Sequence, residues 1–167
     1  MRNELTRKDI ELMRQELEHR RSVLRPRLIE AVKEARAFGD LSENFEYKAA
    51  KKEKNRNDSR CRYLENMIKT AVVISEQSAE GTVGLYDKVT LYVEEDEEEI
   101  TCQIVTTMRQ DALKGRVSKE SPVGRAVLGH RAGERVTVQV NDSYSYDVVI
   151  RSIEPGEDTG EAPLVGF

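Results

Sequence analysis

The stretch Phe38-Gly39-Asp40-Leu41-Ser42-Glu43-Asn44 separates two runs of helical periodicity and decides the fold of the first half of the chain. Gly39 can take the left-handed conformation that ends a helix, and Asp40 or Ser42 can cap the helix that follows. A connection this short between two long helices folds them back on each other. We therefore predict an antiparallel helical hairpin with this stretch at its tip.

The runs on both sides of the tip have the spacing of paired helices. From Ile10 to Ala35, apolar residues recur in steps of three and four, which predicts a helix of about 30 residues that reaches roughly 45 Å. Pro26 should bend this helix, and a division into two helices is the alternative. After the tip, strictly alternating steps of three and four predict a heptad seam at Tyr47, Ala50, Lys54, Asn57, Cys61, Leu64, Ile68 and Ala71.

The second half of the chain changes from helical to strand-like patterning. Residues rich in Val, Ile, Thr and Tyr predict strands at 83–93, 100–107, 135–140 and 144–153. Ser121 and Pro122 open a short helix as a cap and a first-turn proline, and Gly129 closes it. The fold class is therefore α+β.

These patterns divide the chain into three parts: a hairpin at 1–75, a small α+β domain at 76–154 and a flexible acidic tail at 155–167. Residues 1–75 carry 18 Lys and Arg against 13 Asp and Glu, whereas residues 76–167 carry 9 against 18. The basic first part can approach a nucleic acid and the acidic second part would repel one, so the protein should not coat DNA by itself.

Composition excludes several classes of protein. Of the 167 residues 38% are apolar and 35% are charged, and no apolar run approaches the ~20 residues of a membrane span. The first residues lack the apolar stretch of a signal peptide, so we expect a soluble, cytoplasmic protein without a membrane partner. Cys61 and Cys102 stand alone, which predicts two reduced, inert thiols and argues against a disulfide scaffold or a structural zinc site.

Motifs for unaided catalysis are sparse. His19 and His130 fall in different halves of the chain, and no phosphate-binding glycine loop is present. At the hairpin tip, however, Asp40, Glu43 and Glu46 gather carboxylates. Basic residues lie on the helical turns behind them: Arg36, Lys48, Lys51, Lys52 and Lys54.

The carboxylates at the tip have two interpretations. Asp40 and Glu43 have the spacing of a capping box, and acids are favoured at a helix N-terminus. Alternatively, two carboxylates on a stalk can complete a Mg²⁺ site that another protein has partly built, with the basic residues facing nucleic-acid phosphates.

The tip sequence, residues 39–51 (GDLSENFEYKAAK), closely resembles the signature of the Gre transcript-cleavage factors, bacterial transcription elongation factors of the GreA type. The segments Leu5-Thr6, Arg25-Pro26 and 121–129 (SPVGRAVLG) are also similar to the family's pattern. The resemblance covers residues 1 to about 153.

The resemblance implies an N-terminal antiparallel coiled-coil hairpin and a C-terminal FKBP-like domain that docks on RNA polymerase. The hairpin would pass through the secondary channel and stimulate the polymerase's own cleavage of backtracked RNA, so the protein would not be an enzyme by itself. The implied partners are RNA polymerase and the 3′ end of the backtracked RNA, with a contact to DNA allowed in the elongation complex.

The resemblance also implies roles for individual residues. Asp40 and Glu43 would be the catalytic carboxylates and would hold the second Mg²⁺ jointly with the polymerase. Arg36 and Lys51 would bind RNA. Ser121 and Pro122 would take part in polymerase docking.

Two positions depart from the family's pattern. Lys51 stands where Arg is common, which keeps the charge but loses the planar fork for phosphate. Phe45 is bulkier than the expected small residue; its ring can stack on a base or pack against Leu41.

Other functions remain as alternatives. A non-cleaving, inhibitory relative could occupy the same channel, although the intact spacing of Asp40 and Glu43 argues against it. A prolyl isomerase would need an aromatic-lined pocket, for which the second half offers few rings. The cysteine count excludes the metal site of a zinc-containing channel factor.

Overall fold

The computed structural model describes residues 3–39 and 44–166. Asp40 and Glu43, the predicted metal-binding residues, lie outside the described residues. The chain forms two compact units. One contains Asn3 and Ile10–Val72, and the other contains Glu4–Asp9 and Val73–Gly166, so the residues that lead into the first helix belong to the second unit.

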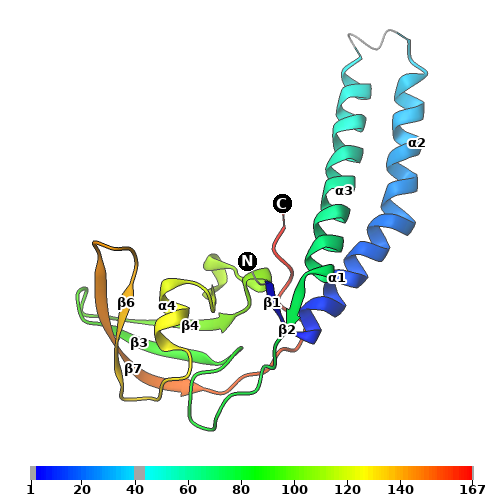
Figure 1. Ribbon diagram of the computed structural model, residues 1–167. Coiled ribbons are helices and arrows are strands. Elements are labelled where there is room, and N and C mark those ends of the chain that lie inside the picture. The colour runs from blue at the N-terminus through cyan, green and yellow to red at the C-terminus, as the bar shows by residue number, and fades with distance from the viewer. Residues whose placement is uncertain (1–2, 40–43, 167) are drawn as a thin grey trace. The chain divides into compact units, whose positions relative to one another are not determined.

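The first unit is the predicted hairpin. Its first arm runs through α1 (Arg7–His19), a π-helical segment η1 (Arg20–Leu24) and α2 (Arg25–Arg36), and its second arm is α3 (Phe45–Lys69). The two arms lie side by side (Figure 1), and the 25 residues of α3 span about 37 Å.

The first arm changes its hydrogen bonding immediately before Pro26. The Arg25 N–H donates to the carbonyl of Arg20, which lies five residues earlier. In a regular α-helix, it would donate to the carbonyl four residues earlier. Because Pro26 has no N–H to donate, the regular ladder cannot continue through this point, and a π segment accommodates the break. The arm changes direction there but continues as helix, as predicted (Figure 1).

The predicted seam of α3 is where the two arms meet. Asn57, Cys61 and Leu64 are buried at the predicted spacing. The polar seam residue Asn57 is satisfied by Arg20, since its Oδ1 accepts from the Arg20 guanidinium at 2.9 Å and its Nδ2 donates to the Arg20 carbonyl at 3.3 Å. The polar interruption of the heptad pattern is therefore a specific contact between the arms.

The second unit is built on a five-stranded sheet with strand order β5-β4-β3-β7-β6. All neighbours are antiparallel except β4 and β5, which are parallel. The strands are β3 (Lys88–Val93), β4 (Glu98–Val105), β5 (Arg116–Ser118), β6 (Arg135–Gln139) and β7 (Ser145–Glu154). Two short strands, β1 (Asn3–Leu5) and β2 (Ala71–Val73), form a separate two-stranded sheet.

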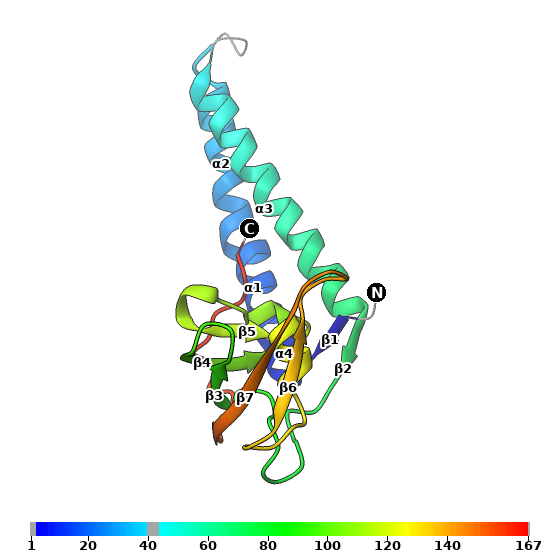
Figure 2. The ribbon, with the colours of Figure 1, turned by 90° about the vertical axis from the view of Figure 1, so that its left-hand side faces the viewer.

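The core of the second unit lies between the sheet and α4 (Pro122–Val127), which packs near β6 (Figure 2). Alternate residues of the strands point inward, as in Val89 and Leu91 of β3. Val127 of α4 and the strand residues Val138 and Ile150 are fully buried with them. The predicted α+β class is confirmed.

The strand predicted from residue 83 begins only at Lys88. Val83 and Leu85 are buried in the core, but the chain bends before the sheet starts. Tyr86 has a φ of 68°, a left-handed conformation that a bulky residue seldom adopts. The Asp87 carboxylate accepts from the Gly84 N–H at 2.8 Å and holds this bend.

The segment after Glu154, which the sequence predicts to be a flexible tail, is attached to the second unit. Gly156 donates its N–H to Asp87 at 3.0 Å, and an added Cβ at Gly156 would lie 2.1 Å from the Tyr86 carbonyl, so only glycine fits. Ala162 is buried, and the Val165 N–H donates to the Met108 carbonyl at 2.8 Å. The structure differs from the prediction because turn-forming and acidic residues here find specific partners.

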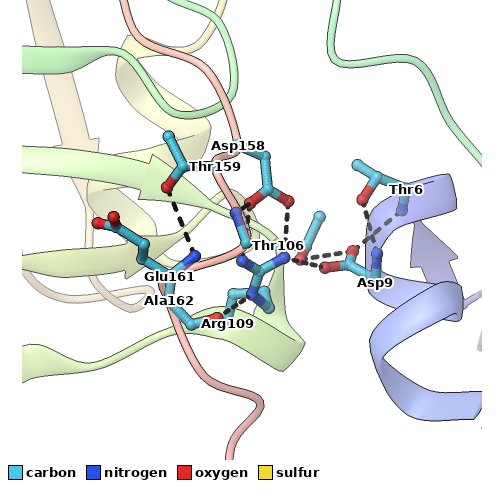
Figure 3. Close-up of polar contacts among 9 residues, drawn as sticks. Thr6, Asp9, Thr106, Arg109, Asp158, Thr159, Glu161 and Ala162 are labelled. Carbon is cyan, nitrogen blue, oxygen red and sulfur yellow. Dashed lines mark hydrogen bonds and ion pairs between the residues drawn. The ribbon is translucent and has the colours of Figure 1, made fainter. Parts of the chain in front are cut away.

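The strongest of these attachments is a cluster of buried charges around Arg109 (Figure 3). Arg109 lies in the short 3₁₀ helix η2 (Thr107–Arg109), ahead of a second one, η3 (Ala112–Lys114). Its guanidinium donates to both carboxylate oxygens of Asp158, at 2.7 and 2.8 Å, to Asp9 at 3.2 Å and to the Ala162 carbonyl at 2.6 Å. Asp9 also accepts from the Thr106 hydroxyl and the Thr6 N–H.

The two cysteines are free and buried, as the inert-thiol prediction requires. Burial raises the pKa of the Cys102 thiol to about 11, which keeps it in the unreactive protonated form at neutral pH. Among the described residues, no helix is long and apolar enough to cross a membrane.

Candidate nucleic-acid interface at the hairpin tip

Asn44 holds the two arms of the hairpin together at the tip. Its side-chain oxygen accepts from the Tyr47 N–H at 2.9 Å, which makes Asn44 the N-cap of α3. Its side-chain nitrogen donates to the Ala35 carbonyl near the end of α2 at 2.6 Å. The capping role predicted for Asp40 or Ser42 is therefore filled by Asn44.

This cap bears on the two interpretations of the tip carboxylates. An N-cap side chain satisfies one or two of the free N–H groups at the start of a helix. Since Asn44 already serves α3 in this way, the helix does not require Asp40 as its N-cap. Both interpretations of Asp40 and Glu43, which lie outside the described residues, stay predictions.

Behind the tip, Tyr47 brings together the two predicted RNA-binding residues. The Arg36 guanidinium donates to the Tyr47 hydroxyl at 3.2 Å and lies 5.4 Å from the centre of the ring. The Lys51 ammonium lies 6.0 Å from the same ring. The structure thus places Arg36 and Lys51, which come from opposite arms of the hairpin, around one aromatic side chain.

The electrostatics of this group are positive. The hydrogen bond from Arg36 and the charges of Lys51 and Arg36 hold the pKa of the Tyr47 hydroxyl below its usual range, against a smaller opposing effect of burial. A hydrogen-bond donor and two positive charges thus favour a negatively charged group beside Tyr47. Such an environment suits a phosphate group.

Phe45, the first residue of α3, carries a second ring at the same end of the hairpin. It is 80% exposed, and the Lys48 ammonium lies 5.8 Å from its centre. Packing against Leu41 was one of two interpretations of this ring, and an exposure this high leaves little area for such packing. Leu41 itself lies outside the described residues.

No group of three or more metal-ligating side chains occurs among residues 3–39 and 44–166. The structure therefore leaves the joint Mg²⁺ site of Asp40 and Glu43 as a prediction.

The predicted docking residues lie at the start of α4. The Ser121 hydroxyl accepts from the Gly124 N–H at 3.1 Å and donates to the Ser118 carbonyl at 2.6 Å. Pro122 occupies the first turn, where its missing N–H costs nothing. Gly124 is required here, because a Cβ would lie 2.1 Å from the Ser118 carbonyl. Capping explains Ser121 fully, and the docking role stays a prediction.

Both units match known protein families. Residues 3–73 match the family "Transcription elongation factor, N-terminal", and residues 77–155 match "Transcription elongation factor, GreA/GreB, C-term". The chain is 43% identical over 136 residues to transcription elongation factor GreA of Geobacillus kaustophilus, which covers 81% of this chain and 86% of the relative. The chain belongs to the GreA/GreB family.

Further similarities extend over most of the chain. Transcription elongation factor GreA of Staphylococcus saprophyticus is 36% identical over 150 residues, or 90% of this chain and 95% of the relative. The solved structure of GreA factor homolog 1 of Thermus thermophilus is 27% identical and covers 93% of this chain and all of its own, with a TM-score of 0.44.

Family membership confirms the predicted function. The chain is a transcription elongation factor with RNA polymerase as its partner, and it stimulates the polymerase's transcript cleavage rather than cutting RNA alone. The family match ends at residue 155, so the attached segment that includes Asp158 and Ala162 lies beyond it.

Sequence reasoning missed two residues of this site. Asn44 is not among the predicted caps, although Asn is among the best N-cap residues and Tyr47 lies three positions later, where an N-cap side chain bonds. The sequence favours Tyr47 as a seam residue over a ligand contact, and its position four residues before Lys51 is the available signal for a shared helix face.

Proposed function

We propose that the hairpin tip carries Asp40 and Glu43 into the polymerase's active centre, where these two carboxylates complete the site of the second Mg²⁺. The observation that supports the proposal is the Asn44 cap: because Asn44 caps α3, the helix does not need Asp40 as its N-cap. The cations behind them supply the affinity for RNA.

The donor set suits the metal. Mg²⁺ prefers carboxylate oxygens and is commonly bound through one or two carboxylates together with phosphates and water. Asp40 and Glu43 supply two such groups and no more, which fits a site that the polymerase and the RNA complete. When bound, the metal would polarise the scissile phosphate and lower the pKa of an attacking water.

The remaining residues of the tip position the RNA. Arg36 and Lys51 contribute positive charge from the two arms, and Tyr47 fixes the guanidinium of Arg36 through its hydroxyl. A phosphate held by this pair would lie next to the tip, where the carboxylates act. The 3′ end of backtracked RNA is the substrate that this arrangement fits, and a nearby DNA strand would meet the same charge.

The second unit provides the docking surface. Pro122 is exposed at the start of α4, while Ser121 and Gly124 fix the direction of the chain there. We include Ser121 and Pro122 in the contact with RNA polymerase. The complex would form in the cytoplasm, where bacterial transcription takes place.

A cleavage assay on a defined arrested complex tests the carboxylates. Asp40→Asn combined with Glu43→Gln should abolish stimulated cleavage and leave polymerase binding within about twofold of wild type, because the charges are removed at constant volume. Glu46→Gln is the matched control, since Glu46 is an exposed carboxylate in the first turn of α3 and should keep full activity.

A non-cleaving inhibitor is the second candidate function. It predicts that the wild-type protein yields no shortened RNA at any dose and slows elongation instead. Normal cleavage by the double variant would show that the carboxylates do not serve the metal.

A further inference from the structure

We propose that Phe45, together with Phe38, stacks on unpaired bases at the extruded 3′ end of the RNA, so that the tip binds the bases as well as the phosphates. This inference rests on the proposed function, because it assumes that the hairpin tip meets single-stranded RNA.

The first observation is the exposure of both rings at one end of the hairpin. Phe38 is 76% exposed and Phe45 is 80% exposed. Phe38 follows α2 and Phe45 begins α3, and the bond from Asn44 to the Ala35 carbonyl draws these helix ends together. A single exposed apolar side chain is common on protein surfaces, but here each arm of the hairpin has an exposed aromatic ring at its tip end.

The second observation is that the Phe45 ring packs against little of the described part of the chain. Tyr47, two residues later, lies about 200° around the helix and faces the seam, where it is half-buried. Phe45 therefore lies on a different face of α3 from Tyr47. Its exposure excludes the role of a packing residue, so its ring is available to a partner.

The third observation identifies the class of partner. Lys48 lies one turn after Phe45 and holds its ammonium 5.8 Å from the ring, and the Tyr47 ring nearby is flanked by Arg36 and Lys51. Aromatic rings beside cations match the two components of a single-stranded nucleic acid, whose bases stack and whose phosphates are negative. An apolar protein surface would match the rings but leave the cations without acceptors.

The test removes the ring and the base separately. Stacking on one base, worth about 1–3 kcal/mol, corresponds to about a 5- to 150-fold change in affinity. Phe45→Ala should raise by that factor the concentration needed for half-maximal cleavage of an arrested complex. Phe45→Tyr should act like wild type, and Phe45→Leu should act like Phe45→Ala because leucine is apolar but has no ring. Phe38→Ala should show a loss of the same kind.

The same variants are then assayed on a complex whose extruded nucleotide lacks its base. There the difference between wild type and Phe45→Ala should disappear, since neither protein has a base to stack on. Tyr63→Ala is the matched control, because Tyr63 is an exposed ring on α3 that also lies near a cation, Arg60 at 5.3 Å, but 18 residues further along the helix. It should behave like wild type on both RNAs.

Two results would overturn the inference: full activity of Phe45→Leu, or an equal loss for Phe45→Ala on normal and base-free RNA, which would assign the ring to a contact with the polymerase. A separate readout distinguishes this failure from failure of the proposed function. A 2-aminopurine at the RNA 3′ end should lose fluorescence when wild type binds and not when Phe45→Ala binds, even in the Asp40→Asn, Glu43→Gln background where cleavage is absent.

Discussion

At the scale of single residues, the tip depends on Asn44. One side chain both starts α3 and holds the end of α2, through bonds of 2.9 and 2.6 Å. The sequence offers three residues suited to an N-cap within five positions, Asp40, Ser42 and Asn44, and their intrinsic preferences are nearly equal. Local sequence could therefore predict a cap near the tip but not which residue provides it.

Asn44→Ala should lower the free energy of unfolding by about 0.5–2 kcal/mol, since the first turn of α3 loses its side-chain acceptor. Asn44→Ser keeps an acceptor and should recover part of the loss. Chemical denaturation followed by circular dichroism measures both. If Asn44→Ala were as stable as wild type, the two hydrogen bonds of the Asn44 side chain would not contribute to the stability of the hairpin.

Lys51→Glu should weaken the response to backtracked complexes, because it replaces a phosphate-attracting charge beside Tyr47 with a repelling one. The difference in affinity between variant and wild type should narrow as the salt concentration rises. The slope of the logarithm of affinity against the logarithm of salt concentration should fall in size by about 0.7 for each phosphate of the single strand that the variant no longer neutralises. Lys69→Glu, an exposed charge at the far end of α3, is the control. A salt slope identical to that of wild type would contradict an RNA contact.

At the scale of elements, the arms are joined by a polar network as well as by the seam. Glu16 of α1 accepts from Arg60 of α3 at 2.7 Å and from Arg20 at 2.8 Å. Burial alone would raise the pKa of Glu16, but the hydrogen bonds from Arg60 and Arg20 outweigh it and lower the pKa. The charged form of Glu16 is therefore the one that stabilises the hairpin.

The sign of the pH dependence follows from this lowered pKa. Glu16 contributes stability above its unfolded pKa, about 4.5, and the contribution is lost as the pH falls through the folded value. The free energy of unfolding in urea should fall between pH 7 and pH 3, and it should fall less in Glu16→Gln than in wild type. Glu30→Gln, at an exposed position of α2, should keep the wild-type dependence of the unfolding free energy on pH. The same pH dependence in all three proteins would show that Glu16 does not stabilise the hairpin through this network.

Prediction of the elements succeeded where periodicity is strong and failed where conformation depends on the rest of the fold. The three- and four-residue spacing placed Asn57, Cys61 and Leu64 in the seam correctly. The strand pattern extended five residues too far toward residue 83, because Val83 and Leu85 are core residues in a bent segment. Burial alone produces the same apolar signal as a strand.

At the scale of the whole molecule, Arg109 joins distant parts of the sequence. Its side chain and that of Asp9 are fully buried, and that of Asp158 is 2% exposed. A fully buried arginine is rare, and its partners lie 100 residues before and 49 residues after it. No local pattern signals such a cluster, so the sequence predicted a loose tail where the structure has an attached one.

Asp158→Ala should destabilise the second unit by about 3–5 kcal/mol, because Arg109 loses two buried hydrogen bonds to a charged partner, worth roughly 1.5–3 kcal/mol each, while it keeps Asp9. Thermal and chemical unfolding measure the loss. Glu157→Ala, an exposed neighbour, should change stability by less than about 0.5 kcal/mol. Equal stability of the two variants would mean that the segment after Glu154 is not part of the folded unit.

The attachment of Asp158 has a consequence for how the protein is made. Residues 4–9 and 156–165 are both needed to complete the environment of Arg109, and the second segment is synthesised long after the first. On the ribosome, the hairpin can pair from local contacts as soon as it emerges, since its arms are adjacent in sequence. All strands of the sheet are synthesised before Asp158, so a chain truncated after Glu154 would have a complete hairpin, but its Arg109 would keep Asp9 and lack both Asp158 and the Ala162 carbonyl.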